Sequence, residues 1–170
     1  RQSPFYPLFA SLDINAKMQE GELGEKLWND CLTVSTNARK KIIEKCKYIR
    51  PFIPETVQGK NWEEASTDEI ISNLEYWKFN PDEKWHGFNG YGKDQYYIDP
   101  NKFLLTTPGI DSKDDSYMNF GIPAVILANY LRENGIVPEK NDLNSILFLM
   151  TPAEDDAKMN NLISKLIQFE

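Results

Sequence analysis

One carboxylate in an otherwise apolar segment is the first side chain whose setting suggests chemistry. Glu139 follows Pro138 in residues 136–140, a segment with the composition of a short β-strand whose proline fits an edge or a strand end. A carboxylate there is either a solvated edge residue or a group that recognises a ligand across a cleft. The residue types alone favour the solvated interpretation, because charged side chains are rarely buried unless they are paired.

The only histidine, His86, lies in the cluster Trp85-His86-Gly87-Phe88. A single imidazole excludes a histidine-based metal site within one chain. The cluster would suit an aromatic or charged ligand, but an imidazole satisfied between aromatic neighbours is the simpler interpretation. We therefore assign His86 no catalytic role and predict no metal ligands in this chain.

Two acidic clusters are predicted to be solvated or capping groups. Asp111, Asp114 and Asp115 lie in a polar loop without the alternating ligands and terminal glutamate of a calcium loop. Residues 154–156 precede a helical pattern, where the helix dipole favours negative charge. The chain also lacks dinucleotide, P-loop, nucleophile-elbow and zincin motifs, so we predict no catalytic residue.

The first half of the chain is predicted to be mainly helical. Residues 1–50 contain a start signal at Ser3-Pro4 and, after Gly21 and Gly24, an amphipathic pattern that needs a partner surface. Residues 51–83 begin with helix-breaking prolines and are predicted to be a connector. The connector is expected to hold a turn at 58–61 and a short helix at Thr67–Trp77.

The second half, residues 84–170, is predicted to form a small α+β domain. Strand patterns at 95–106, 136–140 and 145–151 accompany amphipathic helices at 122–134 and 154–169. The last two strands are too close in sequence for anything but an antiparallel hairpin. The predicted fold class is α+β: a sandwich of a mostly antiparallel sheet with helices on one face, preceded by long helices.

Composition limits the partners. The chain has 19 basic and 26 acidic residues, and its net charge of -7 repels nucleic acid. No apolar run approaches the roughly 18 residues of a membrane span. Cys31 and Cys46 form neither a disulfide framework nor a metal-ligand set, which suggests a reducing cytoplasm. The abrupt start at Arg1, without a methionine, predicts a fragment of a longer protein.

Several segments together resemble the bacterial ornithine/lysine/arginine decarboxylases, which are pyridoxal-phosphate-dependent enzymes of fold type I. The similarity runs in order along nearly the whole chain, and its strongest block resembles the ornithine branch. The segments are Ser3–Asp13, Trp85–Phe88, Asp99–Lys102, Leu104–Gly109, Gly121–Ala124 and, most strongly, Tyr130–Ser145 with Phe148-Leu149 and Thr151–Ala153.

The resemblance implies an aspartate-aminotransferase-type fold and a parent enzyme that converts ornithine to putrescine and carbon dioxide, in polyamine biosynthesis or acid resistance. Residues 1–50 would end the large cofactor domain, and residues 84–170 would be the small domain. The family's cofactor-binding lysine lies in a Ser-x-His-Lys segment that would precede residue 1. No cofactor is therefore expected on this chain, which we expect to be inactive alone. Family members form dimers and larger rings, which implies a homo-oligomer.

The resemblance also changes the interpretation of Glu139. In the family, the glutamate of the Val-Pro-Glu-Lys strand receives the distal ammonium of the substrate, and that position is Glu139 here. A carboxylate at a fixed distance from the cofactor would select substrate length by a charge-assisted contact. Asn141, two residues further along the predicted strand, would line the same pocket.

Two alternatives stay open at this stage. The chain could be a stand-alone interaction module that reuses the small-domain fold, or its parent could prefer lysine or arginine. In either case, separation from the large domain is predicted to expose the apolar face of the long helix and to cause self-association.

Overall fold

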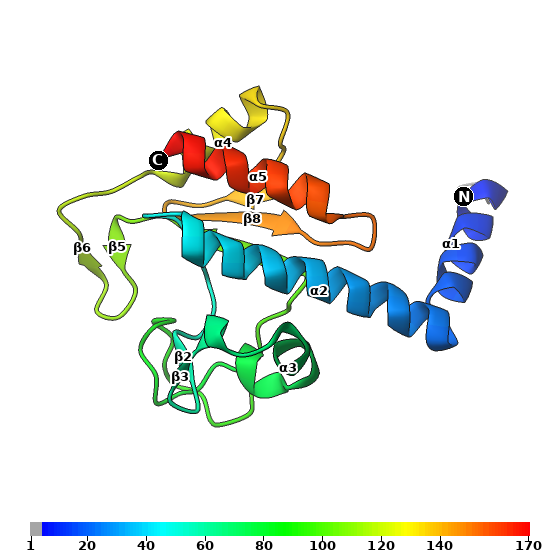
Figure 1. Ribbon diagram of the computed structural model, residues 1–170, viewed down its shortest axis with the longest axis horizontal. Helices are drawn as coiled ribbons and strands as arrows, with labels where there is room; N and C mark the ends of the chain where they lie inside the picture. Colours follow the sequence, from blue (N-terminus) through cyan, green and yellow to red (C-terminus); the bar gives the residue numbers. More distant parts are fainter. Residues whose placement is uncertain (1–4) are drawn as a thin grey trace.

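The computed structural model describes residues 5–170, and a long helix, α2 (Gly21–Lys45), runs through its centre. One hydrophobic core lies on each side of this helix (Figure 1). A shorter helix, α1 (Tyr6–Met18), projects from the start of α2 and buries none of its residues. The prediction of helices within residues 1–50 is confirmed, although the start signal at Ser3-Pro4 lies outside the described residues.

The main sheet has four strands, all antiparallel, in the order β1-β4-β8-β7. Its centre is the pair β4 and β8, and β7 is an edge strand joined to β8 by the predicted hairpin. The strands are β1 (Arg50–Pro51), β4 (Lys102–Thr106), β7 (Lys140–Asn141) and β8 (Ser145–Leu149).

The sheet core forms on one face of this sheet. Phe103 and Leu105 of β4 are opposite Phe148 and Ile146 of β8, and all four side chains are buried. They share one core with α2, α4 (Ala124–Glu133) and α5 (Asp156–Phe169). The predicted α+β class, with helices on one face of an antiparallel sheet, is confirmed.

Several predicted boundaries are wrong for local reasons. The strand expected at 136–140 is only Lys140–Asn141, because Gly135 has φ +78 and the Ile136 N–H still bonds to the Leu131 carbonyl at the end of α4. The strand expected from residue 95 begins at Lys102, after a turn centred on Pro100. The last helix begins at Asp156 rather than at residue 154.

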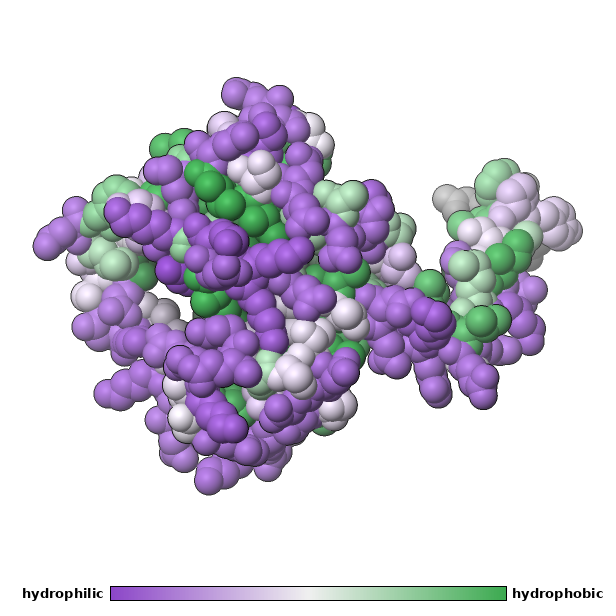
Figure 2. Space-filling model, in the orientation of Figure 1, coloured by the Kyte–Doolittle hydropathy of each residue, from purple (hydrophilic) through white to green (hydrophobic). Residues whose placement is uncertain are grey.

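The prediction that the long helix would expose its apolar face is also wrong. Cys31, Ala38 and Ile42 of α2 are buried in the sheet core. Exposed apolar side chains are frequent on α1, where Leu8 and Leu12 are each more than half exposed, and Leu23 at the start of α2 is exposed as well. Figure 2 shows apolar surface on this projecting arm.

The segment predicted to be a connector has a hydrophobic core of its own, which we call the tryptophan core. Trp62 and Trp77 pack edge to face, with ring centroids 5.6 Å apart, and each indole N–H donates to a backbone carbonyl. The secondary structure around them is short: β2 (Thr56–Val57), β3 (Lys60–Asn61), the 3-10 helix η1 (Trp62–Glu64), α3 (Thr67–Ser72) and the 3-10 helix η2 (Leu74–Trp77).

The sequence predictions for this region are partly confirmed. Gln58 and Gly59 form the expected turn, with φ 52 and φ 80. The helix expected at Thr67–Trp77 is divided at Asn73, whose side chain accepts from the Glu75 N–H and starts η2. The core comprises residues on both sides of position 83, including Trp85 and Ile98. The proposed domain limits at 50 and 83 remain predictions.

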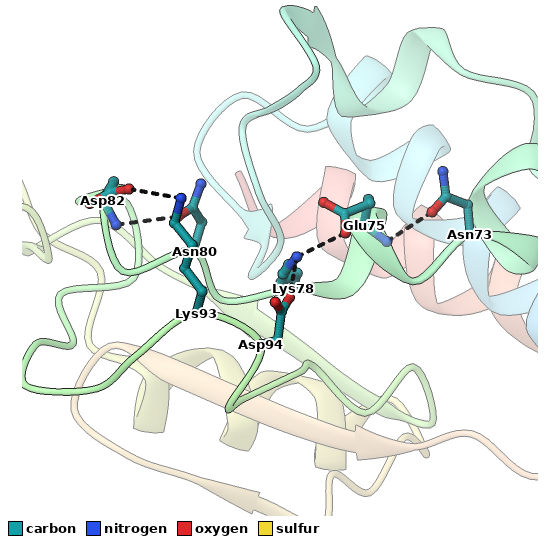
Figure 3. Close-up of polar contacts among 7 residues, drawn as sticks. All are labelled: Asn73, Glu75, Lys78, Asn80, Asp82, Lys93 and Asp94. Carbon is teal, nitrogen blue, oxygen red and sulfur yellow. Dashed lines mark hydrogen bonds and ion pairs between the residues drawn. The ribbon is translucent and has the colours of Figure 1, made fainter.

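A surface ion network holds the outer loop of this region (Figure 3). Lys78 contacts Asp94 and also lies 2.8 Å from Glu75. Lys93 lies 3.9 Å from Asp82. Together with backbone bonds between 77–79 and 96–98, these contacts fix the return of the chain toward β4. Within residues 5–170, no helix is both long and apolar enough to cross a bilayer.

Candidate functional site

Glu139 lines a pocket of about 650 Å³ at the edge of the main sheet. The pocket lies between the segment that follows α4, the end of β8 and the first turns of α5. Its lining is mostly apolar, with three charged side chains: Glu139, Glu154 and Lys158. Such a lining suits an aliphatic chain that carries a cationic end.

Glu139 lines this pocket and has a partly exposed side chain. Its side chain is 39% exposed, and its Oε2 lies 3.9 Å from Nζ of Lys102. Lys102 begins β4, whereas Glu139 immediately precedes β7, so the two residues approach each other from opposite sides of β8. The Glu139 N–H donates to the Leu147 carbonyl at 2.9 Å, which fixes the backbone beneath the carboxylate.

Asn141 has different neighbours. Its Oδ1 accepts a long hydrogen bond, 3.5 Å, from Arg132 of α4, and it is not among the residues that line the Glu139 pocket. The two residues expected to form one subsite thus lie near each other along the chain but make separate contacts. A role for Asn141 in ligand binding stays a prediction.

A larger cavity, about 920 Å³, lies at the opposite end of the β7–β8 hairpin, and the sequence analysis did not identify it. Its walls come from the start of β1, the end of β4, the hairpin loop at 142–145, and the loop that leads into β5 (Ile110–Asp111) and β6 (Ser116–Tyr117). Figure 2 shows a hollow beside this β5–β6 hairpin.

The cavity combines apolar walls with fixed polar groups. The Arg50 guanidinium is held by the carbonyls of Cys46 and Ile49. Asn144 donates to the Pro108 carbonyl at 2.8 Å, and a Cβ on Gly109 would lie 2.4 Å from that same amide nitrogen. Gly109 also has φ +146, a backbone conformation that other residues rarely adopt, so glycine is favoured at this position. Thr106-Thr107-Pro108-Gly109 has the composition of a turn, but a turn does not indicate which segment packs against it.

The structural interpretation of His86 is confirmed. The ring is buried, its Nδ1 accepts from the Phe88 N–H at 3.0 Å, and its Nε2 lies 3.0 Å from the Asn80 carbonyl and 2.9 Å from the Tyr91 hydroxyl. Both ring nitrogens of His86 therefore have hydrogen-bond partners, as expected for a structural imidazole.

Three of the acidic residues accept backbone N–H groups, as expected of capping groups. Asp111 and Asp114 accept backbone N–H groups of their own hairpin, and Asp155 accepts from the Lys158 N–H at 2.8 Å as the N-cap of α5. No group of three metal-ligating side chains occurs among residues 5–170.

A buried arginine, which sequence reasoning did not single out, joins the two cores. Arg39 of α2 is 1% exposed and lies between Trp77 and Phe103, with its guanidinium carbon 5.1 and 4.6 Å from their ring centroids. It donates to the carbonyls of Pro100 and Lys102, at 3.0 and 3.4 Å. Burial lowers the pKa of Arg39 to about 9, and nearby Asp99 opposes that shift, so the group stays charged at neutral pH.

Comparison with known proteins places this α+β unit in a family of amino-acid decarboxylases. A family model described as "Orn/Lys/Arg decarboxylase, major domain" matches residues 1–158. The chain belongs to this family.

Curated relatives within the family differ in similarity. The chain is 58% identical over 168 residues to the inducible ornithine decarboxylase of Lactobacillus sp. strain 30a and to the ornithine decarboxylase of Haemophilus influenzae. It is 34% identical over 169 residues to the inducible lysine decarboxylase of Escherichia coli K12. Each match covers 99% of this chain but only 22–23% of the relative, so the chain spans under a quarter of their length.

Solved structures of lysine decarboxylases are similar in fold to this chain. A Francisella novicida lysine decarboxylase matches 98% of this chain with a TM-score of 0.81 and 31% identity, and the E. coli constitutive lysine decarboxylase gives 0.78 and 30%. Each match covers 22% of the solved chain.

Proposed function

We propose that this chain is a segment of a cytoplasmic, pyridoxal-phosphate-dependent ornithine decarboxylase that supplies a substrate-recognition wall. The observation that carries the proposal is the difference in identity: 58% to ornithine decarboxylases against 34% to a lysine decarboxylase over the same residues. Side chains that distinguish ornithine from lysine are expected to differ between the ornithine and the lysine decarboxylases. A stand-alone module would not require this level of similarity along the whole segment.

In this proposal, Glu139 receives the distal ammonium of ornithine. Its support is the half-open, mostly apolar pocket of about 650 Å³ around a partly exposed glutamate. Apolar walls suit the methylene groups of a diamino acid, and a charge-assisted contact orients its cationic end. An analogue without the distal cation would leave that carboxylate unpaired, which is the basis of selectivity.

Pyridoxal phosphate, when bound in the parent, would supply the electron sink for loss of carbon dioxide. The described residues do not fit the cofactor's attachment site. Lys113, the lysine of the larger cavity, is half exposed and lies 2.9 Å from Glu55, which raises its pKa. A half-exposed lysine held in an ion pair does not provide the buried, free amine that covalent attachment of the cofactor requires. The cofactor is therefore expected to bind elsewhere in the parent, which we propose assembles as a homo-oligomer.

Substrate profiling of the full-length decarboxylase tests this proposal. Carbon dioxide release is expected to be most efficient, by kcat/KM, with ornithine, ahead of lysine and arginine. The isolated 170-residue chain, supplied with pyridoxal phosphate, is expected to release none. Preference for lysine or arginine would contradict the substrate assignment, and turnover by the isolated chain would contradict the assignment of chemistry to the rest of the parent.

A further inference from the structure

Lys102 provides the positive charge that lies beside Glu139 in this structure. Its Nζ is 3.9 Å from Glu139 Oε2. The pocket's own lysine, Lys158, is engaged differently: it lies 3.5 Å from Glu154 and donates to the Ala153 carbonyl at 2.8 Å. Lys102 is therefore the cation with which a positively charged ligand of Glu139 would have to compete.

The backbone of Lys102 is firmly placed. Arg39, which is buried, donates to the carbonyls of Pro100 and Lys102, while the Lys102 N–H donates to the Asp99 carbonyl at 3.0 Å. Lys102 is also in register with Leu149 at the end of β8. The base of the side chain is thus fixed, whereas the side chain itself is 47% exposed and has solvent into which its ammonium can move.

We propose that Lys102 is a specificity-determining residue that competes with the distal ammonium of the substrate for Glu139. The inference rests on the proposed function, since it requires Glu139 to bind that ammonium. Two cations near one carboxylate repel each other, so a diamino acid binds only when Lys102 turns toward solvent. Because the pair is half exposed, the competition is modest in size.

Kinetics of the full-length decarboxylase test the competition. Lys102→Met is expected to lower KM for ornithine about two- to fivefold, the range set by exposed ion pairs, and to leave kcat unchanged. Lys102→Arg keeps the charge and is expected to keep the original KM. Lys60→Met, at an exposed lysine of β3, removes the same net charge far from the sheet core and is expected to change nothing.

A double-mutant cycle separates this inference from the function on which it rests. On a Glu139→Gln background, Lys102→Met is expected to have no effect on KM, because the shared carboxylate is gone. An unchanged or raised KM in Lys102→Met, or the same decrease on both backgrounds, would overturn the competition while Glu139 still binds ornithine. If Glu139→Gln itself leaves KM for ornithine unaltered, the proposed function fails first.

Discussion

The sheet core and the tryptophan core pack against the same helix but are stabilised differently. In the sheet core, buried side chains alternate with less buried ones along β4, three consecutive side chains of β8 are buried, and strand pairing satisfies the backbone. In the tryptophan core, two-residue strands and short helices leave carbonyls that the indole N–H groups of Trp62 and Trp77 satisfy. The paired strands of the sheet core form a continuous surface on which a binding site can be placed. The tryptophan core depends instead on individual side-chain hydrogen bonds.

Substitution of Arg39 is expected to cause the largest loss of stability, because Arg39 contacts both the sheet core and the tryptophan core. Arg39→Met would remove the Arg39 hydrogen bonds to the carbonyls of Pro100 and Lys102 and the guanidinium that lies between Trp77 and Phe103. The Pro100 carbonyl would keep only the Ser35 hydroxyl, at 3.2 Å. The free energy of unfolding is expected to fall by about 2–4 kcal/mol, because two buried carbonyls lose hydrogen bonds to a charged donor. Urea denaturation followed by both tryptophan fluorescence and circular dichroism measures it. A loss below about 1 kcal/mol would show that the two cores do not depend on this residue.

Matched substitutions in each core test whether the two regions open separately. Trp62→Phe removes volume and the hydrogen bond to the Tyr76 carbonyl, and Phe103→Leu removes volume from the sheet core; each is expected to cost about 1–3 kcal/mol. Hydrogen exchange should show that Trp62→Phe leaves the amides of β4 and β8 protected, whereas Phe103→Leu exposes them. Equal loss of protection in both variants would mean that the cores unfold as one unit.

The same contrast explains what the sequence predicted. The helices, the β7–β8 hairpin and the buried face of α5 follow from periodicity, and the structure confirms them. The tryptophan core was taken for a connector because its stability comes from indole–carbonyl bonds between residues distant in sequence, such as Trp62 and Tyr76. Arg39 was missed for a similar reason: in sequence it is one basic residue of an amphipathic helix, and only packing shows that it is buried.

The candidate site was predictable only in part from the sequence. Glu139 stood out as a charge in an apolar segment, but its partner Lys102 lies 37 positions earlier and no local pattern joins them. The larger cavity was not predictable either, since its walls come from segments near residues 50, 108 and 144 that meet only through the sheet topology.

The sheet core is also expected to lose stability at high pH through Cys46. Burial, with a smaller contribution from Glu170, raises the pKa of this thiol from 9.0 to about 11. The folded state favours the protonated thiol, so its stabilising effect is complete below about pH 9 and is lost as the pH rises toward 11. Cys46→Ala should therefore lose less stability than the original chain between pH 8 and pH 10.5 in urea denaturation. Parallel losses in both proteins would contradict the assignment.

Substitution of helix caps is expected to cause the smallest losses of stability. One cap from each region allows the two regions to be compared. Asp155 caps α5 and Ser66 caps α3, each by accepting a backbone N–H. Replacement of either by alanine is expected to cost about 1 kcal/mol. Asp155→Ala should lower the global midpoint of urea denaturation, while Ser66→Ala should mainly raise hydrogen exchange around α3. A purely local effect of Asp155→Ala would contradict the view that α5 is part of the cooperative sheet core.

The proposed recognition of a diamino acid by Glu139 is tested most directly by kcat/KM for ornithine in the full-length decarboxylase. Glu139→Gln keeps the shape and removes the charge, and Glu133→Gln, on the exposed side of neighbouring α4, is the matched control. We predict a decrease of about 10- to 100-fold for Glu139→Gln, mainly through KM, because a hydrogen bond to a charged group is lost. Equal kcat/KM values for the two variants would contradict the account.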